Sequence, residues 1–209
     1  MVSTVEPLMT CRAGAARLSS PELMRKKPEI LRRRTIAETR VFRVEQLDLK
    51  FANGREASYE RLYASPAGAV LVVPMADEST VLLIREYAAG VNRYELCLPK
   101  GRIDEGESMY ETANRELMEE IGYGARNLEH IKSVSLAPGY VGHTTHILLA
   151  TGLYPEKRVG DEPEEIEVVP WPLARLTELV QLSDCTEART IAALFMVREH
   201  LSKVDRERA

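Results

Sequence analysis

The most informative segment of the chain reads Gly101-Arg-Ile-Asp-Glu-Gly-Glu107-Ser-Met-Tyr-Glu111-Thr-Ala-Asn-Arg115-Glu116-Leu-Met-Glu119-Glu120-Ile-Gly122-Tyr123. Ser108, followed three residues later by Glu111, is a capping box, which marks where a helix begins. Three apolar residues at four-residue spacing then form one stripe suited to a core: Ala113, Leu117 and Ile121. Gly122 and Gly124 favour the left-handed conformation that ends a helix. The segment therefore predicts a helix over residues 108–121 with one buried face.

Three carboxylates crowd one face of this predicted helix. Glu116, Glu119 and Glu120 fall within about 100° of arc, and like charges at these spacings weaken a helix. Mg²⁺ would offset that repulsion, because it binds carboxylate oxygens and shares them with waters and substrate phosphates. Arg115, four residues before Glu119, would orient that side chain by an ion pair. The triplet alone is more typical of a solvated acidic face, so the metal hypothesis depends on the wider pattern.

Composition limits the possible partners and compartments. The 209 residues suit one domain with a small accessory part, and the formal net charge of −4 provides no general attraction for nucleic acid. No apolar run approaches the roughly 18 residues that a membrane helix needs, so no membrane partner is expected. The three cysteines, Cys11, Cys97 and Cys185, form neither a disulfide framework nor a metal-binding pattern. A reducing, cytoplasmic location is therefore expected.

The remaining sequence reads as strands followed by helices. Residues 35–62 mix apolar and polar side chains around Asn53-Gly54, which predicts a β-hairpin. Two apolar runs at residues 69–75 and 81–85, separated by Asp77-Glu78-Ser79, predict a second hairpin. Further strands are expected at residues 131–136, 146–151 and 166–169, and two helices between residues 173 and 201. The N-terminal residues show no periodicity, and we expect a mobile extension over residues 1–27.

The segment from Gly101 to Tyr123 resembles the Nudix box, whose pattern is G-x5-E-x7-R-E-U-x-E-E-x-G-U, with U a bulky apolar residue. All seven fixed positions match: Gly101, Glu107, Arg115, Glu116, Glu119, Glu120 and Gly122. Leu117 fits the first U, whereas Tyr123 at the last U is bulky but not aliphatic. The resemblance extends over about residues 28–201, through Leu98-Pro99-Lys100-Gly101, Ala137-Pro-Gly-Tyr140 and Gly160-Asp-Glu-Pro163. The chain is thus similar to ADP-ribose pyrophosphatases and to the ADP compounds hydrolase (NudE) subgroup.

This resemblance implies a fold, a reaction and an assembly. The fold would be α/β, a Nudix α/β/α sandwich with a mixed β-sheet and a small N-terminal β-rich accessory region. Residues 28–65 would form that β region and mediate a homodimer, and residues 66–203 would form the Nudix hydrolase domain. The implied reaction is Mg²⁺- or Mn²⁺-dependent hydrolysis of the pyrophosphate bond in ADP-linked nucleotides, releasing AMP. Candidate substrates are ADP-ribose, NADH and diadenosine polyphosphates.

The resemblance also implies roles for individual residues. The metal would be held by Glu116 and Glu120, by Glu119 as a bridging ligand or through water, and by the backbone carbonyl of Lys100. Glu119 is therefore expected in the catalytic set as well as in the metal set. A second catalytic glutamate would come from the acidic loop before the strand at residues 166–169. Glu164 is the first candidate there and Glu162 the second, although a plain solvated loop is an equally ordinary explanation.

Substrate contacts are predicted for three further side chains. Arg61 and Arg85 could bind phosphate with two parallel hydrogen bonds, and Glu95 could accept them from adenine or ribose. Structural ion pairs would explain each of these residues equally well. Tyr140 could stack on a base or only pack its loop. His143 and His146 precede a strand and lack a third ligand, which favours ordinary surface or core histidines over zinc.

Two alternative functions belong to other classes. A non-hydrolytic Nudix module that senses ADP-ribose or NAD commonly lacks some box glutamates, whereas this chain keeps all of them. An RNA-processing Nudix enzyme would need an extended basic surface, which the net charge does not suggest, and the short run Arg32-Arg33-Arg34 is more typical of solvated side chains. The hydrolase of ADP-linked nucleotides is therefore the favoured hypothesis.

Overall fold

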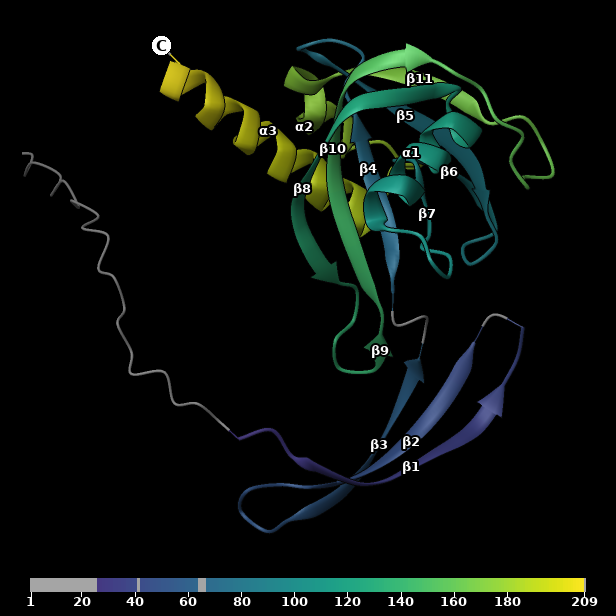
Figure 1. Cartoon of the computed structure of the whole chain (residues 1–209), viewed down its shortest axis with the longest axis vertical. Helices are drawn as coiled ribbons and strands as arrows, with labels where there is room; N and C mark the ends of the chain where they lie inside the picture. The colour runs from purple at the N-terminus through teal and green to yellow at the C-terminus, as the bar shows by residue number, and fades with distance from the viewer. Residues whose placement is uncertain (1–25, 41, 64–66, 209) are drawn as a thin grey trace, which may run out of the picture.

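The computed structural model describes residues 26–40, 42–63 and 67–208 (Figure 1). The mobile extension predicted over residues 1–27 lies outside the described residues, except for Lys26 and Lys27. Within the described ranges, no helix is long and apolar enough to cross a bilayer.

The N-terminal region forms a small sheet apart from the main body of the molecule. Its strands are β1 (Glu29–Glu38), β2 (Arg43–Lys50), β3 (Glu56–Tyr63) and the short β9 (Val141–Gly142). The hairpin predicted at Asn53-Gly54 is confirmed: β2 pairs with β3 from Lys50↔Glu56 onward, and Gly54 has a φ of +81°. The parallel pairing of β3 with β9 connects this sheet to the domain that lies above it in Figure 1.

The main body contains two further sheets. One has the order β7 (Lys100–Arg102), β4 (Ala69–Pro74), β10 (Thr144–Pro155) and β8 (Tyr123–Ser135). The other has the order β11 (Glu167–Pro172), β5 (Thr80–Ala88) and β6 (Arg93–Cys97). Strands β4 and β10 run parallel, and the other pairs in these two sheets are antiparallel, so the strands are mixed in direction.

The second predicted hairpin is wrong. Strands β4 and β5 form where expected, but the single bridge Met75↔Val81 joins them before they diverge into different sheets. Strand β4 is almost wholly buried, and residues 81–84 of β5 are all buried, so neither run shows the alternation that would indicate its partner. In its sheet, β4 lies between β7 and β10 and pairs with both. In the other sheet, β5 lies between β6 and β11 and pairs with both.

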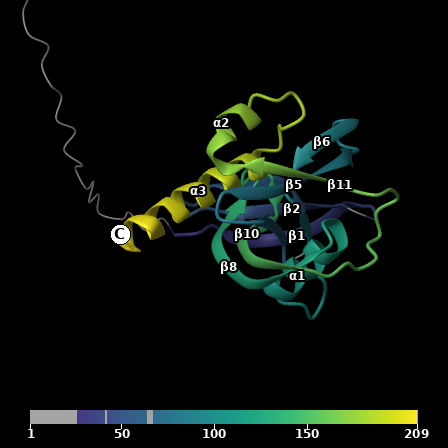
Figure 2. The same cartoon turned by 90° about the horizontal axis from the view of Figure 1, so that it is seen from above.

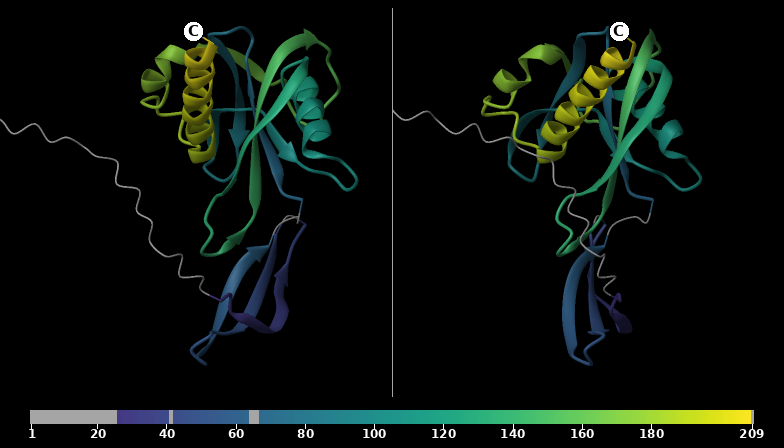
Figure 3. Two further views of the ribbon diagram at one scale, coloured as in Figure 1. Left: turned by 60° about the vertical axis from the view of Figure 1, so that its left-hand side comes forward. Right: turned by 90° about the vertical axis from the view of Figure 1, so that its left-hand side faces the viewer.

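Helices cover both faces of these strands, which confirms the predicted α/β/α sandwich. Helix α1 (Met109–Glu120) lies on one side, and η1 (Leu173–Arg175), α2 (Leu176–Leu179) and α3 (Ala188–Arg208) lie on the other (Figures 2 and 3). Successive side chains of β4 pack in two different cores. Val70 and Val72 belong to the core under α1, whereas Leu71 and Val73 belong to the core under α3. The long apolar runs of the sequence are therefore strands buried on both faces.

Candidate active site

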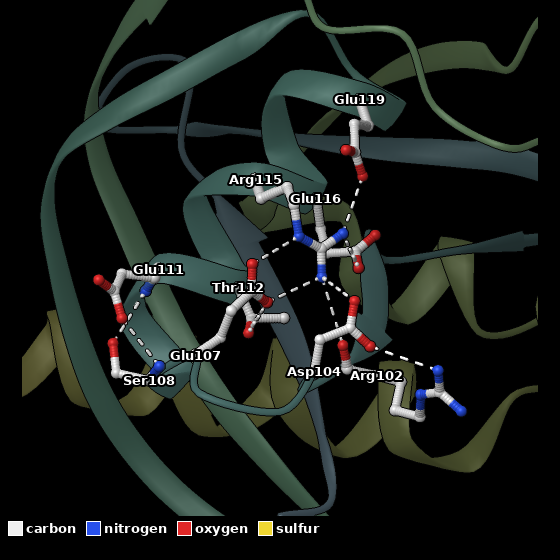
Figure 4. A network of polar contacts seen from close by, with 9 residues as sticks. All are labelled: Arg102, Asp104, Glu107, Ser108, Glu111, Thr112, Arg115, Glu116 and Glu119. Carbon is white, nitrogen blue, oxygen red and sulfur yellow. Dashed lines mark hydrogen bonds and ion pairs between the residues drawn. The ribbon is translucent and has the colours of Figure 1, made fainter.

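Helix α1 begins where its capping box predicts. The backbone N–H of Glu111 donates to the Ser108 Oγ at 3.2 Å, and the Ser108 N–H donates to Glu111 Oε2 at 2.8 Å (Figure 4). Ala113 and Leu117 are fully buried against the sheets, and Gly122 ends the helix with a φ of +73°. The buried apolar stripe fixes the rotation of the helix, and this rotation decides where its glutamates point.

Arg115 is the centre of the polar network in Figure 4. Its guanidinium donates to both carboxylate oxygens of Glu107 at 3.1 Å, to Glu116 Oε1 at 2.8 Å and to Glu119 Oε2 at 2.9 Å. The pair that the sequence predicts with Glu119 therefore forms, and two more box glutamates share the same cation. The hydrogen bonds from Arg115 lower the pKa of Glu107. A single arginine thus orients three carboxylates toward one region.

Two of the box glutamates are buried. Glu116 is 8% exposed and Glu120 is 6% exposed. Burial raises the pKa of Glu116 to about 7, although the nearby Arg115 opposes the shift. Burial also raises the pKa of Glu120 well above its ordinary value, against the opposing charge of Lys100. Buried carboxylates with raised pKa values are typical of functional sites.

Lys100 contacts this carboxylate cluster through two different groups. Its backbone N–H donates to Glu120 Oε2 at 3.0 Å, and its ammonium pairs with Glu86 and lies 3.3 Å from the Cys97 Sγ. The sequence pointed only to the carbonyl of Lys100, because Glu86 lies on a strand of the other sheet. The side chain of Lys100 is therefore a cation beside the glutamates that no local pattern indicated.

The carboxylate oxygens at this site are suitable ligands for a hard divalent cation, although they are hydrogen-bonded to other groups. In the part of the chain that the structure describes, no three acidic, histidine or cysteine side chains are arranged to hold a metal as they stand. Arg115 engages Glu116 and Glu119, and the Lys100 N–H engages Glu120. Carboxylate oxygens are nevertheless the ligands that Mg²⁺ prefers, and a cation would favour the charged form of both buried glutamates.

Gly101 leaves the space that the Glu116 carboxylate occupies. A Cβ at position 101 would overlap that carboxylate. We predict that Gly101→Ala displaces Glu116 and lowers kcat/KM by at least about tenfold, because a small misplacement of a catalytic group is costly. Gly90→Ala is the control, since no atom lies within 4 Å of a Cβ there. The prediction would be contradicted if steady-state kinetics gave the same kcat/KM for both variants.

A cavity of about 550 Å³ opens beside the box. Glu116 and Glu119 line one side of it, and Gly160 and Glu162 of the acidic loop line the other. Glu164, the loop glutamate that the sequence placed first, lines a neighbouring cavity of about 460 Å³ together with Glu119. Its Oε1 accepts a hydrogen bond from the Tyr94 hydroxyl at 2.8 Å, a contact that no sequence pattern predicted.

The three predicted substrate contacts are engaged within the chain. Arg61 donates to Glu45 at 2.8 and 3.1 Å, Arg85 pairs with Glu167 and Asp184, and Glu95 accepts from the Thr186 N–H at 3.0 Å. None of the three lines the cavity beside the box. Their role in substrate binding stays a prediction that would require these contacts to rearrange.

The aromatic and histidine candidates lie elsewhere. Tyr140 is 62% exposed, and its carbonyl accepts from the backbone N–H of Leu62. The ring nitrogens of His146 lie 2.8 Å from the Ser133 Oγ and 3.3 Å from the Ala67 carbonyl. The ring nitrogens of His146 thus have polar partners within the chain.

Comparison with known proteins matches both parts of the chain. Residues 28–61 match the NudE-type Nudix hydrolase N-terminal domain, and residues 65–194 match the NUDIX domain. The chain is 49% identical to ADP compounds hydrolase NudE of Escherichia coli K12 over 84% of this chain and 94% of that protein. It is 32% identical to ADP-ribose pyrophosphatase of Bacillus subtilis 168 over 78% and 91%.

A solved structure shows the same similarity in three dimensions. The crystal structure of an ADP compounds hydrolase superposes with a TM-score of 0.80 at 48% sequence identity. The match covers 87% of this chain and 97% of that one, so it includes both the N-terminal sheet and the sandwich. The chain belongs to the Nudix hydrolase family and carries a NudE-type N-terminal domain ahead of its NUDIX domain.

Proposed function

We propose that the chain hydrolyses the pyrophosphate bond of ADP-linked nucleotides, such as ADP-ribose, NADH and diadenosine polyphosphates, and releases AMP. The observation that carries this proposal is the complete box, whose glutamates are gathered by Arg115 at the edge of a cavity. The similarity to an ADP compounds hydrolase and to an ADP-ribose pyrophosphatase supports the substrate class.

Divalent-metal dependence is typical of the Nudix family, and we propose Mg²⁺ or Mn²⁺ as the cation here. Glu116, Glu119 and Glu120, with the carbonyl of Lys100, would hold it. When bound, the cation would neutralise charge that develops on the phosphates and lower the pKa of a nearby water. Arg115 orients Glu116 and Glu119 and holds Glu107 in its charged form. The loop glutamate would help position the attacking water or take up its proton.

We further propose a homodimer formed by the N-terminal region, residues 28–65, attached to a hydrolase domain over residues 66–203. Large apolar side chains stand exposed on or beside β1 to β3: Ile30, Leu31, Ile36, Phe42 and Tyr59. Isolated proteins rarely leave such a group uncovered, which supports an interface in this region. Light scattering during size exclusion tests the assembly, and a monomer mass would contradict it. A cytoplasmic location also stays a prediction.

Release of AMP from ADP-ribose tests the proposed function directly. We expect AMP and ribose 5-phosphate in equal amounts with Mg²⁺, and loss of turnover when EDTA removes the metal. A protein that binds ADP-ribose tightly without cleaving it, with Mg²⁺ or Mn²⁺ present, would instead support the sensing module. A panel of ADP-ribose, NADH and diadenosine polyphosphates then ranks the substrates by kcat/KM.

A further inference from the structure

The acidic loop between β10 and β11 is fixed at both of its ends. At its start, the backbone N–H of Glu156 donates to the Gly122 carbonyl at 3.1 Å, and that of Arg158 donates to the Met118 carbonyl at 3.0 Å. At its end, β11 begins with Glu167 paired opposite Arg85 of β5. The loop therefore leaves the end of the box helix and must cross beside the box before it joins the sheet.

The middle of the loop lies against the box helix. A Cβ on Gly160 would be 3.4 Å from the Cβ of Glu119 and would overlap the carboxylate of Glu162. Glu162 lines the same cavity as Glu116 and Glu119. Among the loop glutamates, Glu162 lines the cavity beside the box, and Glu164 and Glu165 do not.

Glu164 is held by a different group, two residues further on. Its Oε1 accepts the 2.8 Å hydrogen bond from Tyr94, which lies on β6. The Tyr94 ring packs edge-on against Tyr87, with centroids 5.7 Å apart, so one aromatic neighbour supports its orientation. A tyrosine hydroxyl keeps its proton at neutral pH and can donate, and the hydrogen bond to Glu164 raises the pKa of Tyr94 further.

We propose that Tyr94 is a positioning residue, whose hydroxyl ties Glu164 to β6 and thereby presents Glu162, rather than Glu164, to the box cavity. This inference rests on the proposed function and divides the two loop glutamates by role. Glu162 serves the reaction, and Glu164 is the anchor of the loop. The geometry behind this division is that Glu162 lines both neighbouring cavities, whereas Glu164 lines only the second and not the cavity beside the box.

Tyr94→Phe tests the anchor because it removes one oxygen and keeps the ring. We expect kcat for ADP-ribose to fall about five- to tenfold with KM within twofold, the effect of losing one hydrogen bond that positions the loop. Backbone amides of residues 159–166 should exchange with solvent deuterium faster in the metal-free variant than in the metal-free wild type. Glu164→Ala removes the acceptor and should resemble Tyr94→Phe, and the double variant should be no worse than either single change. Glu164→Gln keeps an amide oxygen that can accept from Tyr94 and should stay near the wild-type kcat.

Glu162→Gln should lower kcat about a hundredfold or more, as expected for loss of a group that handles the proton. Tyr87→Phe is the matched control, because the Tyr87 hydroxyl bonds Asn92 of its own hairpin and not the loop. The proposal is overturned if Tyr94→Phe matches Tyr87→Phe in both kcat and amide exchange, or if Glu164→Gln loses as much activity as Glu162→Gln. An inactive wild type would contradict the proposed function instead, and amide exchange would still decide whether the anchor exists.

Discussion

Glu120→Gln is expected to lower kcat/KM for ADP-ribose with Mg²⁺ roughly a thousandfold while raising the melting temperature of the metal-free protein at pH 7.5. The activity should fall because an amide supplies no negative charge to a cation, and one lost electrostatic contact of this kind costs about a hundred- to a thousandfold. The melting temperature should rise because the wild type buries a carboxylate whose pKa burial drives upward.

The structure shows why the substitution should be tolerated. Glutamine has nearly the volume of glutamate, and its amide oxygen can still accept from the Lys100 N–H that now donates to Glu120. The Lys100 ammonium keeps Glu86 as its partner. The expected stabilisation shifts the melting temperature by about 2–4 °C for each kcal/mol in a chain of this size. Function and stability therefore change in opposite directions, as expected for a residue retained for its chemistry.

Glu105→Gln is the matched control. It makes the same chemical change in the same segment, on a side chain that is exposed rather than buried. Both its turnover and its melting temperature should stay near the wild-type values. Near-normal turnover of Glu120→Gln with Mg²⁺, together with an unchanged melting temperature, would contradict the role given to Glu120.

The box helix was predictable because its signals are local. Ser108 and Glu111 are three residues apart, and Gly122 alone supplies the positive φ at the end. Strands β4 and β5 were predicted as elements but with the wrong partners, because burial on both faces removes the alternation that indicates pairing. Strand β1 begins at Glu29, earlier than the pattern indicated, because all ten of its residues are exposed.

The site was predictable only as far as the box extends. The crowding of Glu116, Glu119 and Glu120 followed from helical spacing. The contacts that complete the site join residues far apart in the chain, such as Tyr94 with Glu164 and Lys100 with Glu86. Their partners are brought together by the pairing of different strands, which no single period along the sequence encodes. The same limit explains why the ion pairs of Arg85 could not be distinguished in advance from a phosphate site.

The second large expected effect is a dependence of Mg²⁺ affinity on pH. A carboxylate must lose its proton to bind the metal, so affinity rises with pH below its pKa. With the pKa of Glu116 at about 7, the charged fraction increases about fiftyfold between pH 5 and pH 7. Apparent Mg²⁺ affinity should rise at least as much, since the raised pKa of Glu120 acts in the same direction. Calorimetric titration with Mg²⁺ at pH 5, 6, 7 and 8 measures this.

The stability of the metal-free protein should change in the opposite sense. Because the pKa of Glu116 is raised from 4.5 to about 7 on folding, its contribution to stability is fully present below pH 4.5 and is lost as the pH rises through 7. The pKa of Glu107 is lowered on folding, so its contribution to stability has the opposite pH dependence. That contribution is lost only at acidic pH, below the ordinary pKa range of a glutamate. The melting temperature without metal should therefore fall from pH 5 to pH 8, and saturating Mg²⁺ should remove most of the fall.

One other group in this window requires a control. Burial lowers the pKa of His143, so its contribution to stability is lost as the pH falls through the folded value, which opposes the trend from Glu116. The difference in melting temperature between wild type and Glu116→Gln cancels the histidine contribution, because His143 is present in both proteins. That difference should change steadily between pH 5 and pH 8 without metal and should reverse when Mg²⁺ saturates the wild type. A difference that stays constant with pH would mean that Glu116 is charged in the metal-free fold, and that its burial plays no part in metal binding.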